Sequence, residues 1–503
     1  MTYDSDVIVI GSGAGGATFA YACAEAGKSV LLLERGKRYP TLIPPASPAS
    51  QEQAVLIDKA PYDDRAVEVN GTSKGLYAGG VFGGGTSLYG GALLRPSLDD
   101  FSPGKRYGDR LPRELWEWPI GYEALESHYT RAERLMGVGG DCADDFGPLG
   151  KPVAGYINRP LPLHPLNEKL IAANRSIGLH PFRLPLAIDP RSCLRCGACA
   201  GYVCPTGARR SAGHLVDTAQ ANGWPLKVLT GVDVERISFG AGGRADGVHV
   251  VERATGRRSM YRARYFALAA GAIHSPLLLL RSGDNHPLIG RNYMTHLSPI
   301  VAGVFKQKTG AENAFVKQVG FSDFYFGTKT IADKLGLVQS LPVPGPLLAA
   351  KAAPRGFPRW LINFLRRRML PLAGIIEDLP DPENRVTAGP KGEPRVTHRF
   401  GEYDLERGRM LGKFMYRILK AAGAAFCLPT HFASDEHVAH QCGTLRFGRD
   451  PSNAVLDQDC RSFAHPNVFA VDGSFFPTSL GVGPALTIMA NALRIAQRVA
   501  IEA

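Results

Sequence analysis

The 503-residue sequence contains no apolar run long enough to span a bilayer and no internal repeat. These absences argue against a helical membrane protein and against a solenoid. The first apolar segment begins within about five residues of the N-terminus, which leaves no room for a signal peptide ahead of it. The sequence therefore favours a cytoplasmic location.

The sequence also lacks a basic stripe interleaved with aromatic residues, although its formal net charge is +12. Its positive charges are scattered, so a nucleic-acid partner is not predicted. A hydrophobic content of 45% and a charged content of 21% are typical of a globular protein. The excess positive charge is best interpreted as an aid to solubility and an attraction to anionic partners.

Glycine is abundant and patterned near the N-terminus. Residues 7–10 form a short apolar run typical of a buried strand, and Gly11, Gly13 and Gly16 then fall into the spacing GxGxxG at the start of a helical pattern. A second apolar run ends at Glu34, whose carboxylate can accept hydrogen bonds from ribose hydroxyls. Because the helix N-terminus offers amide donors to phosphate, the segment predicts a dinucleotide site.

A second glycine-rich stretch, residues 79–91, has seven glycines in thirteen residues together with embedded apolar side chains. Such a loop fits against a flat ligand where side chains would collide. Between these two stretches, residues 40–64 are polar and proline-rich, which predicts a surface excursion. Residues 300–430 show longer alternating segments, which predict a second, largely antiparallel domain.

Four blocks in this order resemble the GMC (glucose–methanol–choline) flavin oxidoreductases over nearly the whole chain. They comprise residues 6–16, 83–91, 271–283, and 440–444 with 467–474. The resemblance implies FAD rather than NAD as the cofactor. It also implies an α/β fold (α+β overall), with a Rossmann-like FAD-binding domain assembled from discontinuous segments and a substrate domain built on an antiparallel sheet. We expect the FAD domain at 1–155, 205–295 and 440–503, and the substrate domain at 156–204 and 296–439.

The resemblance also assigns cofactor-binding residues to all four blocks. The backbone of Val232 would hold the adenine, and the helix that begins near Pro484 would direct its N-terminus at the flavin pyrimidine ring. The full predicted set is Gly11, Gly13, Ala14, Gly16, Glu34, Gly83, Gly85, Thr86, Ser87, Gly91, Val232, Ala270, Gly271, Asp472, Gly473, Pro484 and Ala485.

In relatives, a base takes the hydroxyl proton while a hydride passes to flavin N5, and His440 matches that base within the motif HxxGT. The second active-site position, usually His or Asn, falls on Gly483, which offers no side-chain donor or acceptor. A neighbouring group could substitute, with Tyr89 and His296 as candidates. Alternatively the pocket admits a bulkier substrate, or the chemistry has drifted. Packing is an equally good interpretation of Tyr89 and His296.

A cysteine cluster is the next feature, with Cys193, Cys196, Cys199 and Cys204 followed by proline. This spacing approaches that of a bacterial ferredoxin but has four residues before the last cysteine instead of three. An iron–sulfur cluster, a zinc ion and metal-free thiols or a disulfide are the three interpretations.

Residues 351–371 mix aromatic and apolar side chains with arginines at helical spacing. The pattern is typical of an interfacial membrane helix, of a lid over an apolar substrate, or of a docked helix with a solvated arginine face. It favours a lid or an element in peripheral contact with a membrane. The first suggests an apolar alcohol as substrate, and the second suggests an acceptor such as a quinone or an electron-transfer protein.

The sequence as a whole predicts an FAD-dependent dehydrogenase that oxidises the C–OH group of an alcohol, a sugar or another hydroxylated small molecule, apolar ones included, and passes the electrons to an acceptor other than oxygen. The alternatives are an oxidase that uses oxygen, a redox-neutral or light-driven enzyme (lyase or decarboxylase) on the same scaffold, and an FAD-containing electron-transfer subunit without substrate chemistry.

Overall fold

The computed structural model of the chain describes residues 3–39, 52, 61–197, 199–353, 356–432 and 440–502. Its elements form a mixed α/β architecture with one parallel sheet and several antiparallel ones, which confirms the predicted fold class. Most of the predicted surface excursion at 40–64 lies outside the described residues.

The parallel sheet has five strands in the order β19–β10–β1–β2–β6, and every neighbouring pair runs parallel. Its members are short apolar runs drawn from distant parts of the chain, as expected for strands covered on both faces. They are β1 (Ser5–Ile10), β2 (Val30–Glu34), β6 (Leu226–Thr230), β10 (Ala263–Leu268) and β19 (Val468–Ala470).

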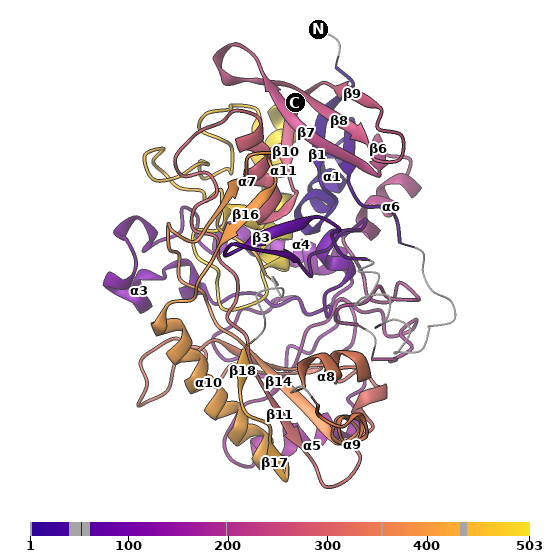
Figure 1. Cartoon of the computed structure of the whole chain (residues 1–503), viewed down its shortest axis with the longest axis vertical. Helices are drawn as coiled ribbons and strands as arrows, with labels where there is room; N and C mark the ends of the chain where they lie inside the picture. Colours follow the sequence, from indigo (N-terminus) through magenta and orange to yellow (C-terminus); the bar gives the residue numbers. More distant parts are fainter. Residues whose placement is uncertain are drawn as a thin grey trace.

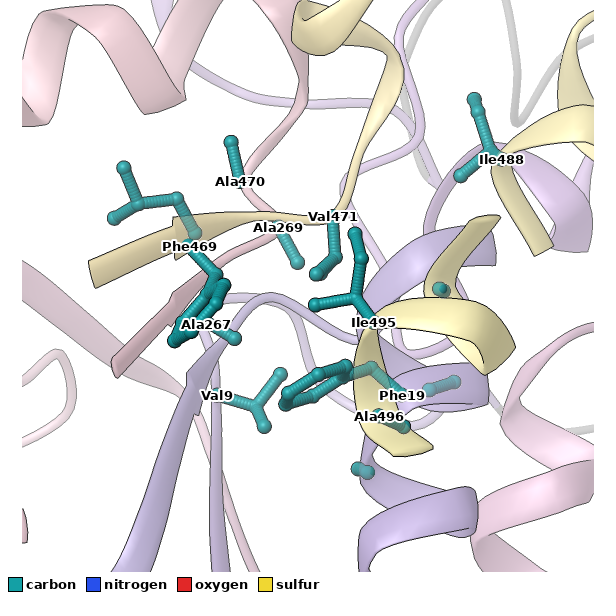
Figure 2. Close-up of a cluster of buried hydrophobic side chains, with 14 of the residues drawn as sticks. Val9, Phe19, Ala267, Ala269, Phe469, Ala470, Val471, Ile488, Ile495 and Ala496 are labelled. Carbon is teal, nitrogen blue, oxygen red and sulfur yellow. The ribbon is translucent and has the colours of Figure 1, made fainter. Parts of the chain in front are cut away.

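Two helices pack against this sheet and against each other, namely α1 (Ala14–Glu25) and the C-terminal α11 (Ala485–Glu502). Figure 2 shows Phe19 of α1 and Ile495 of α11 meeting over Val9 of β1, beside strand β19. The helices α4 (Glu123–Leu135) and α6 (Gly213–Ala221) flank them. The first and last segments of the chain therefore share one hydrophobic core.

A seven-stranded antiparallel sheet forms the other half of the molecule (Figure 1). Helix α10 (Glu402–Ala421) packs on it, and α5 (Pro165–Arg175) packs on α10. The strand order is β17 (Phe426–Cys427), β11 (Pro299–Val304), β14 (Met369–Ile375), β13 (Leu337–Ser340), β12 (Val319–Phe321) and β5 (Phe182–Arg183), with β18 (His431–Phe432) also paired to β11.

Two smaller sheets complete the fold. One pairs β3 (Ala66–Val69) and β4 (Thr72–Gly75) with β15 (Arg385–Ala388) and β16 (Pro394–Thr397), so it joins segments that the sequence assigns to different domains. The other contains β7 (Val232–Phe239), β8 (Ala245–Glu252) and β9 (Arg258–Tyr261).

Two continuous stretches of sequence are divided in the structure. Gly231, at φ 72°, separates β6 from β7, so the apolar run at 228–234 is shared between the parallel sheet and a second sheet. Residues 351–371 are not one helix, because they comprise the end of α8 (Pro346–Ala352), the eight-residue α9 (Arg359–Arg366) and the start of β14. The remaining helices are α3 (Gly104–Tyr107) and α7 (Gly271–Arg281). Within the described ranges, none of the helices has the length and apolarity needed to cross a bilayer.

Candidate active site

The first glycine motif combines two packing glycines with one that faces open space. A Cβ added to Gly11, whose φ is 104°, would lie 2.4 Å from the carbonyl oxygen of Ala269, and one added to Gly16 would lie 1.9 Å from that of Gly11. A Cβ at Gly13 would meet no protein atom within 4 Å. Gly13 is the N-cap of α1, which begins at Ala14 and has no side-chain cap. The first amides of α1 are therefore free to bind an anion beside an uncovered backbone.

Glu34, at the end of β2, is connected to both glycine loops. Its Oε2 accepts hydrogen bonds from the Ser12 amide (2.8 Å) and hydroxyl (2.6 Å), and the same hydroxyl oxygen accepts one from the Gly83 amide (2.9 Å). Burial raises the pKa of Glu34. Sequence reasoning missed Ser12, whose only signal is its place between the first two glycines.

The second glycine loop lies directly on the first. A Cβ at Gly84 would be 2.9 Å from the Cα of Gly13, whereas Gly85 faces open space. Thr86 Oγ1 donates to the Gly83 carbonyl (2.6 Å) and accepts from the Ala212 amide (2.8 Å). Ser87 Oγ donates to the Phe82 carbonyl (2.8 Å), and Gly91 has φ 81°. The loop is held by its own side chains, which leaves glycine backbone uncovered beside α1.

Asp472, just after β19, brings the other predicted cofactor residues together. Its carboxylate accepts from the amides of Gly271 (2.7 Å) and Ser474 (2.9 Å) and from the Ser275 hydroxyl (2.5 Å), next to Ala270. A Cβ at Gly473 would lie 2.6 Å from the Gln441 carbonyl, which brings this turn against the HxxGT segment.

The last two predicted groups flank these turns. Val232 begins β7 next to the end of β2, where the Gly231 amide donates to the Gly36 carbonyl (3.3 Å). Ala485 is the first residue of α11, and Pro484 directly precedes it. The uncovered glycines, the free helix N-terminus and Glu34 at the carboxyl end of a parallel sheet fit a dinucleotide, and the FAD-binding roles of the individual residues stay predictions.

The catalytic candidates meet where two chain segments pair. An antiparallel bridge between Met294 and Cys442 places His296 opposite His440, and their Nδ1 atoms lie 2.8 Å apart. The His296 Nε2 atom is 3.1 Å from the carbonyl oxygen of Ser479 and 2.9 Å from that of Leu480.

These partners fix the tautomers of both rings. Carbonyl oxygens only accept, so His296 carries its proton on Nε2 and its Nδ1 has a lone pair. That lone pair accepts from His440, whose proton therefore resides on Nδ1. Among the described residues no group bonds to His440 Nε2, so this atom keeps a free lone pair, the state that a general base requires.

His296 is buried, His440 is partly buried, and both imidazoles are neutral near pH 7. Burial, followed by the charges of His296 and Lys317, lowers the pKa of His440 well below its ordinary value. Burial lowers the pKa of His296 to about 4. Neutrality of both rings agrees with the hydrogen-bond assignment.

Gly483 puts no side chain over the candidate base. A Cβ at this position would lie 3.4 Å from His440 Nε2, so a histidine or asparagine side chain would emerge directly in front of that atom. With glycine there, no side chain from this position covers His440 Nε2. His296 lies on the opposite, Nδ1 side of the ring, so it acts through His440 and does not replace the missing side chain.

The backbone around the pair is strained and firmly held. His440 (φ 67°) and Leu480 (φ 61°) are both non-glycine residues in the left-handed region, a conformation that concentrates at functional sites. Glu377 Oε1 accepts from the Leu480 amide (3.0 Å), and Lys334 Nζ donates to Glu377 and Asp100 (2.6 Å each). This buried ionic network carried no recognisable sequence signal, because its members are isolated charged residues far apart in the chain.

Tyr89 belongs to the scaffold of the glycine loop. Its hydroxyl donates to the Arg210 carbonyl (2.7 Å), and burial raises its pKa. Its hydrogen is thus engaged away from the histidine pair.

The four-cysteine segment does not form a metal-binding group. Among the described residues no set of three or more His, Cys, Asp or Glu side chains is arranged to hold a metal ion, and all four thiols are free. The sulfurs instead accept from nearby amides, Arg195 to Cys193 and Arg209 to Cys204 (3.4 Å each), while burial raises the pKa of Cys199 to about 12. The predicted iron–sulfur cluster and its zinc alternative find no support.

Comparison with known proteins identifies the family. Models of the GMC oxidoreductase N- and C-terminal regions match residues 5–298 and 380–492, so the chain belongs to the GMC oxidoreductases, a membership that implies FAD. It is 31% identical to 6'''-hydroxyparomomycin C oxidase of Streptomyces lividus and 30% identical to paromamine 6'-oxidase of Streptomyces fradiae. Each comparison covers 98% of this chain and 91% of the relative. The fold matches pyridoxine 4-oxidase from Mesorbium loti with a TM-score of 0.67 at 22% identity, over 98% of this chain and 99% of that one.

Proposed function

We propose that the protein is an FAD-dependent enzyme that oxidises a C–OH carbon to a carbonyl. The observation that carries the proposal is the His296–His440 pair, which, among the described residues, leaves the His440 Nε2 lone pair unbonded beside Gly483, a residue without a side chain. The two Streptomyces relatives are named as oxidases, one of them of a hydroxylated compound, which supports the same reaction class.

The chain's own residues manage the proton. His440 Nε2 accepts the hydroxyl proton of the substrate, which converts the ring to an imidazolium with a hydrogen on each nitrogen. His296 Nδ1 continues to accept from the His440 Nδ1–H, and this bond strengthens when the donor is charged. FAD, when bound, supplies the hydride acceptor for the substrate carbon.

Anaerobic mixing tests the proposal. We expect a panel of alcohols and sugars to bleach the flavin of the wild-type holoenzyme. Replacing His440 with alanine should slow flavin reduction by about 10²-fold or more while FAD stays bound, because a general base contributes about that much. His465, a buried histidine bonded to Asp284 and to the Gly243 carbonyl, provides the matched control as His465→Gln. Unchanged reduction in His440→Ala would contradict the assignment of the base.

Two further outcomes would redirect the proposal. Product formation without flavin reduction, or only under blue light, would identify a redox-neutral or light-driven enzyme. A flavin that stays oxidised across the panel, with no product, would favour an electron-transfer subunit.

For the electron acceptor we propose a molecule other than oxygen, such as a quinone or an electron-transfer protein. The support is the exposed aromatic and basic surface of α9, described below, which suits an acceptor at a membrane. Rapid peroxide formation in air would instead make the protein an oxidase, as its Streptomyces relatives are named.

A further inference from the structure

Lys317 lies against Gly90 of the second glycine loop, and its charge influences the candidate base His440. It precedes β12, on the antiparallel sheet, and only 9% of its surface is exposed. A Cβ built on Gly90 would fall 2.6, 2.8 and 2.9 Å from the Lys317 Cδ, Cε and Nζ atoms, so the end of this side chain occupies the space beside that glycine. Its charge also lowers the pKa of His440, which places the ammonium near the base.

No protein group neutralises this ammonium. Within the described part of the chain, neither a hydrogen bond nor an ion pair reaches Lys317 Nζ. Lys334, the comparable buried lysine, donates at 2.6 Å to both Asp100 and Glu377. A buried cation is normally paired because removal from water is costly, so an unpaired one indicates a ligand that supplies the missing charge.

Lys317 is the charged group that acts on His440. Among the described residues, the groups besides burial that influence the pKa of His440 are the neutral His296 and the Lys317 ammonium, while the nearby Glu377 is already paired with Lys334. Within the same part of the chain, the group besides burial that influences the pKa of Lys317 is the Cys199 thiol, which is protonated at neutral pH because its own pKa is raised. The region in front of the base therefore attracts anions.

We propose that Lys317 binds an anionic group of the substrate, a carboxylate or a phosphate, while the substrate hydroxyl is presented to His440. The inference rests on the proposed function and names its substrate class, a hydroxylated anion. The reaction leaves the anionic group unchanged. FAD, when bound, would supply the acceptor for the hydride that leaves the carbon, and His440 Nε2 takes the hydroxyl proton as the C=O bond forms. An ammonium paired with a carboxylate or phosphate oxygen makes a charge-assisted hydrogen bond that orients the ligand.

Binding to the oxidised holoenzyme tests the site without turnover. The probes are 4-(hydroxymethyl)benzoate, 4-(hydroxymethyl)phenyl phosphate and the neutral 4-(hydroxymethyl)benzamide, followed by perturbation of the flavin absorbance. We expect the wild type to bind at least one anion about tenfold or more tightly than the amide, as one charge-assisted hydrogen bond allows. Whichever anion is preferred distinguishes carboxylate from phosphate.

Lys317→Met should abolish that preference, whereas Lys308→Met, which removes an exposed lysine of the same region, should retain it. Lys317→Arg keeps the charge and should retain part of the preference for the anion over the amide. Because the methionine removes an unpaired buried cation, we expect the variant to fold with an unchanged or higher melting temperature.

A wild type that does not discriminate between anion and amide would overturn the proposal whatever the variants do. A Lys317→Met variant that keeps the preference would also overturn it. So would a Lys317→Met variant that binds all three probes equally more weakly and has a shifted flavin midpoint potential, since Lys317 would then act on the flavin. Anion binding without any flavin reduction would leave the site standing and contradict the proposed function. Reduction of the flavin by neutral alcohols only, with no anion preference in binding, would leave the proposed function standing and contradict the anion site.

Discussion

The hydrogen bond between His296 and His440 determines which nitrogen of the base is available. A carbonyl can only accept, so the fixed backbone carbonyl of Leu480 sets the proton of His296, and His296 in turn sets the proton of His440. The unusual φ of Leu480 is part of this arrangement, because it belongs to the segment whose carbonyls face the pair. A strained residue thereby contributes to the pre-organisation of the base.

Removing the acceptor should weaken the base without removing it. For His296→Leu we expect flavin reduction to slow about ten- to a hundredfold, because the imidazolium loses one stabilising hydrogen bond. His296→Gln, whose amide can both donate to the Leu480 carbonyl and accept from His440, should recover much of the rate. Stopped-flow reduction at matched FAD content measures both variants. An equal loss of flavin-reduction rate in the two variants would indicate that His296 contributes by packing and not by its hydrogen bond to His440.

The depressed pKa of His440 predicts the pH dependence of catalysis. A general base acts when deprotonated, so the rate should be constant from about pH 8 down to pH 6.5 and fall only at lower pH, where the imidazole becomes protonated. The groups that face the ring are His296, itself neutral to about pH 4, and Lys317. A neutral alcohol should be used, so that binding at Lys317 does not enter the profile. An acid limb centred at or above pH 6.5 would contradict this environment for the base.

Lys317 adds a second ionisation that only anionic substrates should report. Burial lowers the pKa of its ammonium to about 8. The charged form is the one that binds an anion, so kcat/KM for an anionic substrate should fall as the pH rises above about 8, while kcat/KM for the matched amide should not. A bound anion stabilises the ammonium, so the fall should be weaker in kcat, which reports the enzyme–substrate complex.

Among the elements, the N-terminal strand, turn and helix were the part most fully predictable from sequence. The GxGxxG spacing can be recognised from sequence because each packing glycine is required by a contact with a residue a few positions away or on an adjacent strand. The histidine pair is different. Its members are 144 residues apart, and only the bridge between Met294 and Cys442 brings them together. The sequence could nominate His296 as a candidate but could not reveal which side of His440 it occupies.

Lys317 and the segment 351–371 show two further limits of sequence reasoning. No sequence motif surrounds Lys317. Its proposed role follows only from its lack of a partner among the described residues and from its position beside Gly90. The arginine-rich segment has helical spacing, but its last residues are taken by β14, which pairs with both β11 and β13. Tertiary pairing of a strand overrides a local helical pattern.

The glycine motif itself offers an element-scale prediction. Gly13→Ala adds a methyl group where no protein atom lies within 4 Å, so the apoprotein should keep its free energy of unfolding while FAD affinity falls. Gly16→Ala forces a contact of 1.9 Å with the Gly11 carbonyl and should destabilise the apoprotein by about 1–3 kcal/mol. Chemical denaturation and FAD titration compare the pair. Normal FAD binding by Gly13→Ala would show that this face is not the cofactor side.

At the scale of the whole molecule, the antiparallel half carries exposed aromatic side chains among arginines. On α9, Trp360 is 70% and Phe364 46% exposed, and the Arg368 guanidinium lies 3.8 Å above the Phe364 ring centroid. Arg359 and Arg367 are exposed beside them, whereas Arg366 is buried and donates to the Pro344 carbonyl (3.0 Å). Aromatic side chains flanked by arginines suit the headgroup region of an anionic membrane, where each basic residue contributes about 1 kcal/mol.

We therefore expect the protein to sediment with vesicles that contain phosphatidylserine and to stay in solution with neutral phosphatidylcholine vesicles. Trp360→Ala combined with Phe364→Ala should reduce the bound fraction, with a partition coefficient about tenfold or more lower, since two large apolar side chains are lost from the interface. Tyr416→Ala on α10, which removes an aromatic side chain that is 47% exposed, is the matched control and should bind as the wild type does. Raising the salt concentration should release the wild type, because the attraction of arginines to anionic lipid is screened. If the Trp360→Ala/Phe364→Ala variant sediments as much as the Tyr416→Ala control, or if neutral vesicles bind the protein as well as anionic ones, α9 does not contact the membrane. The proposal of a membrane-borne acceptor then loses its structural support.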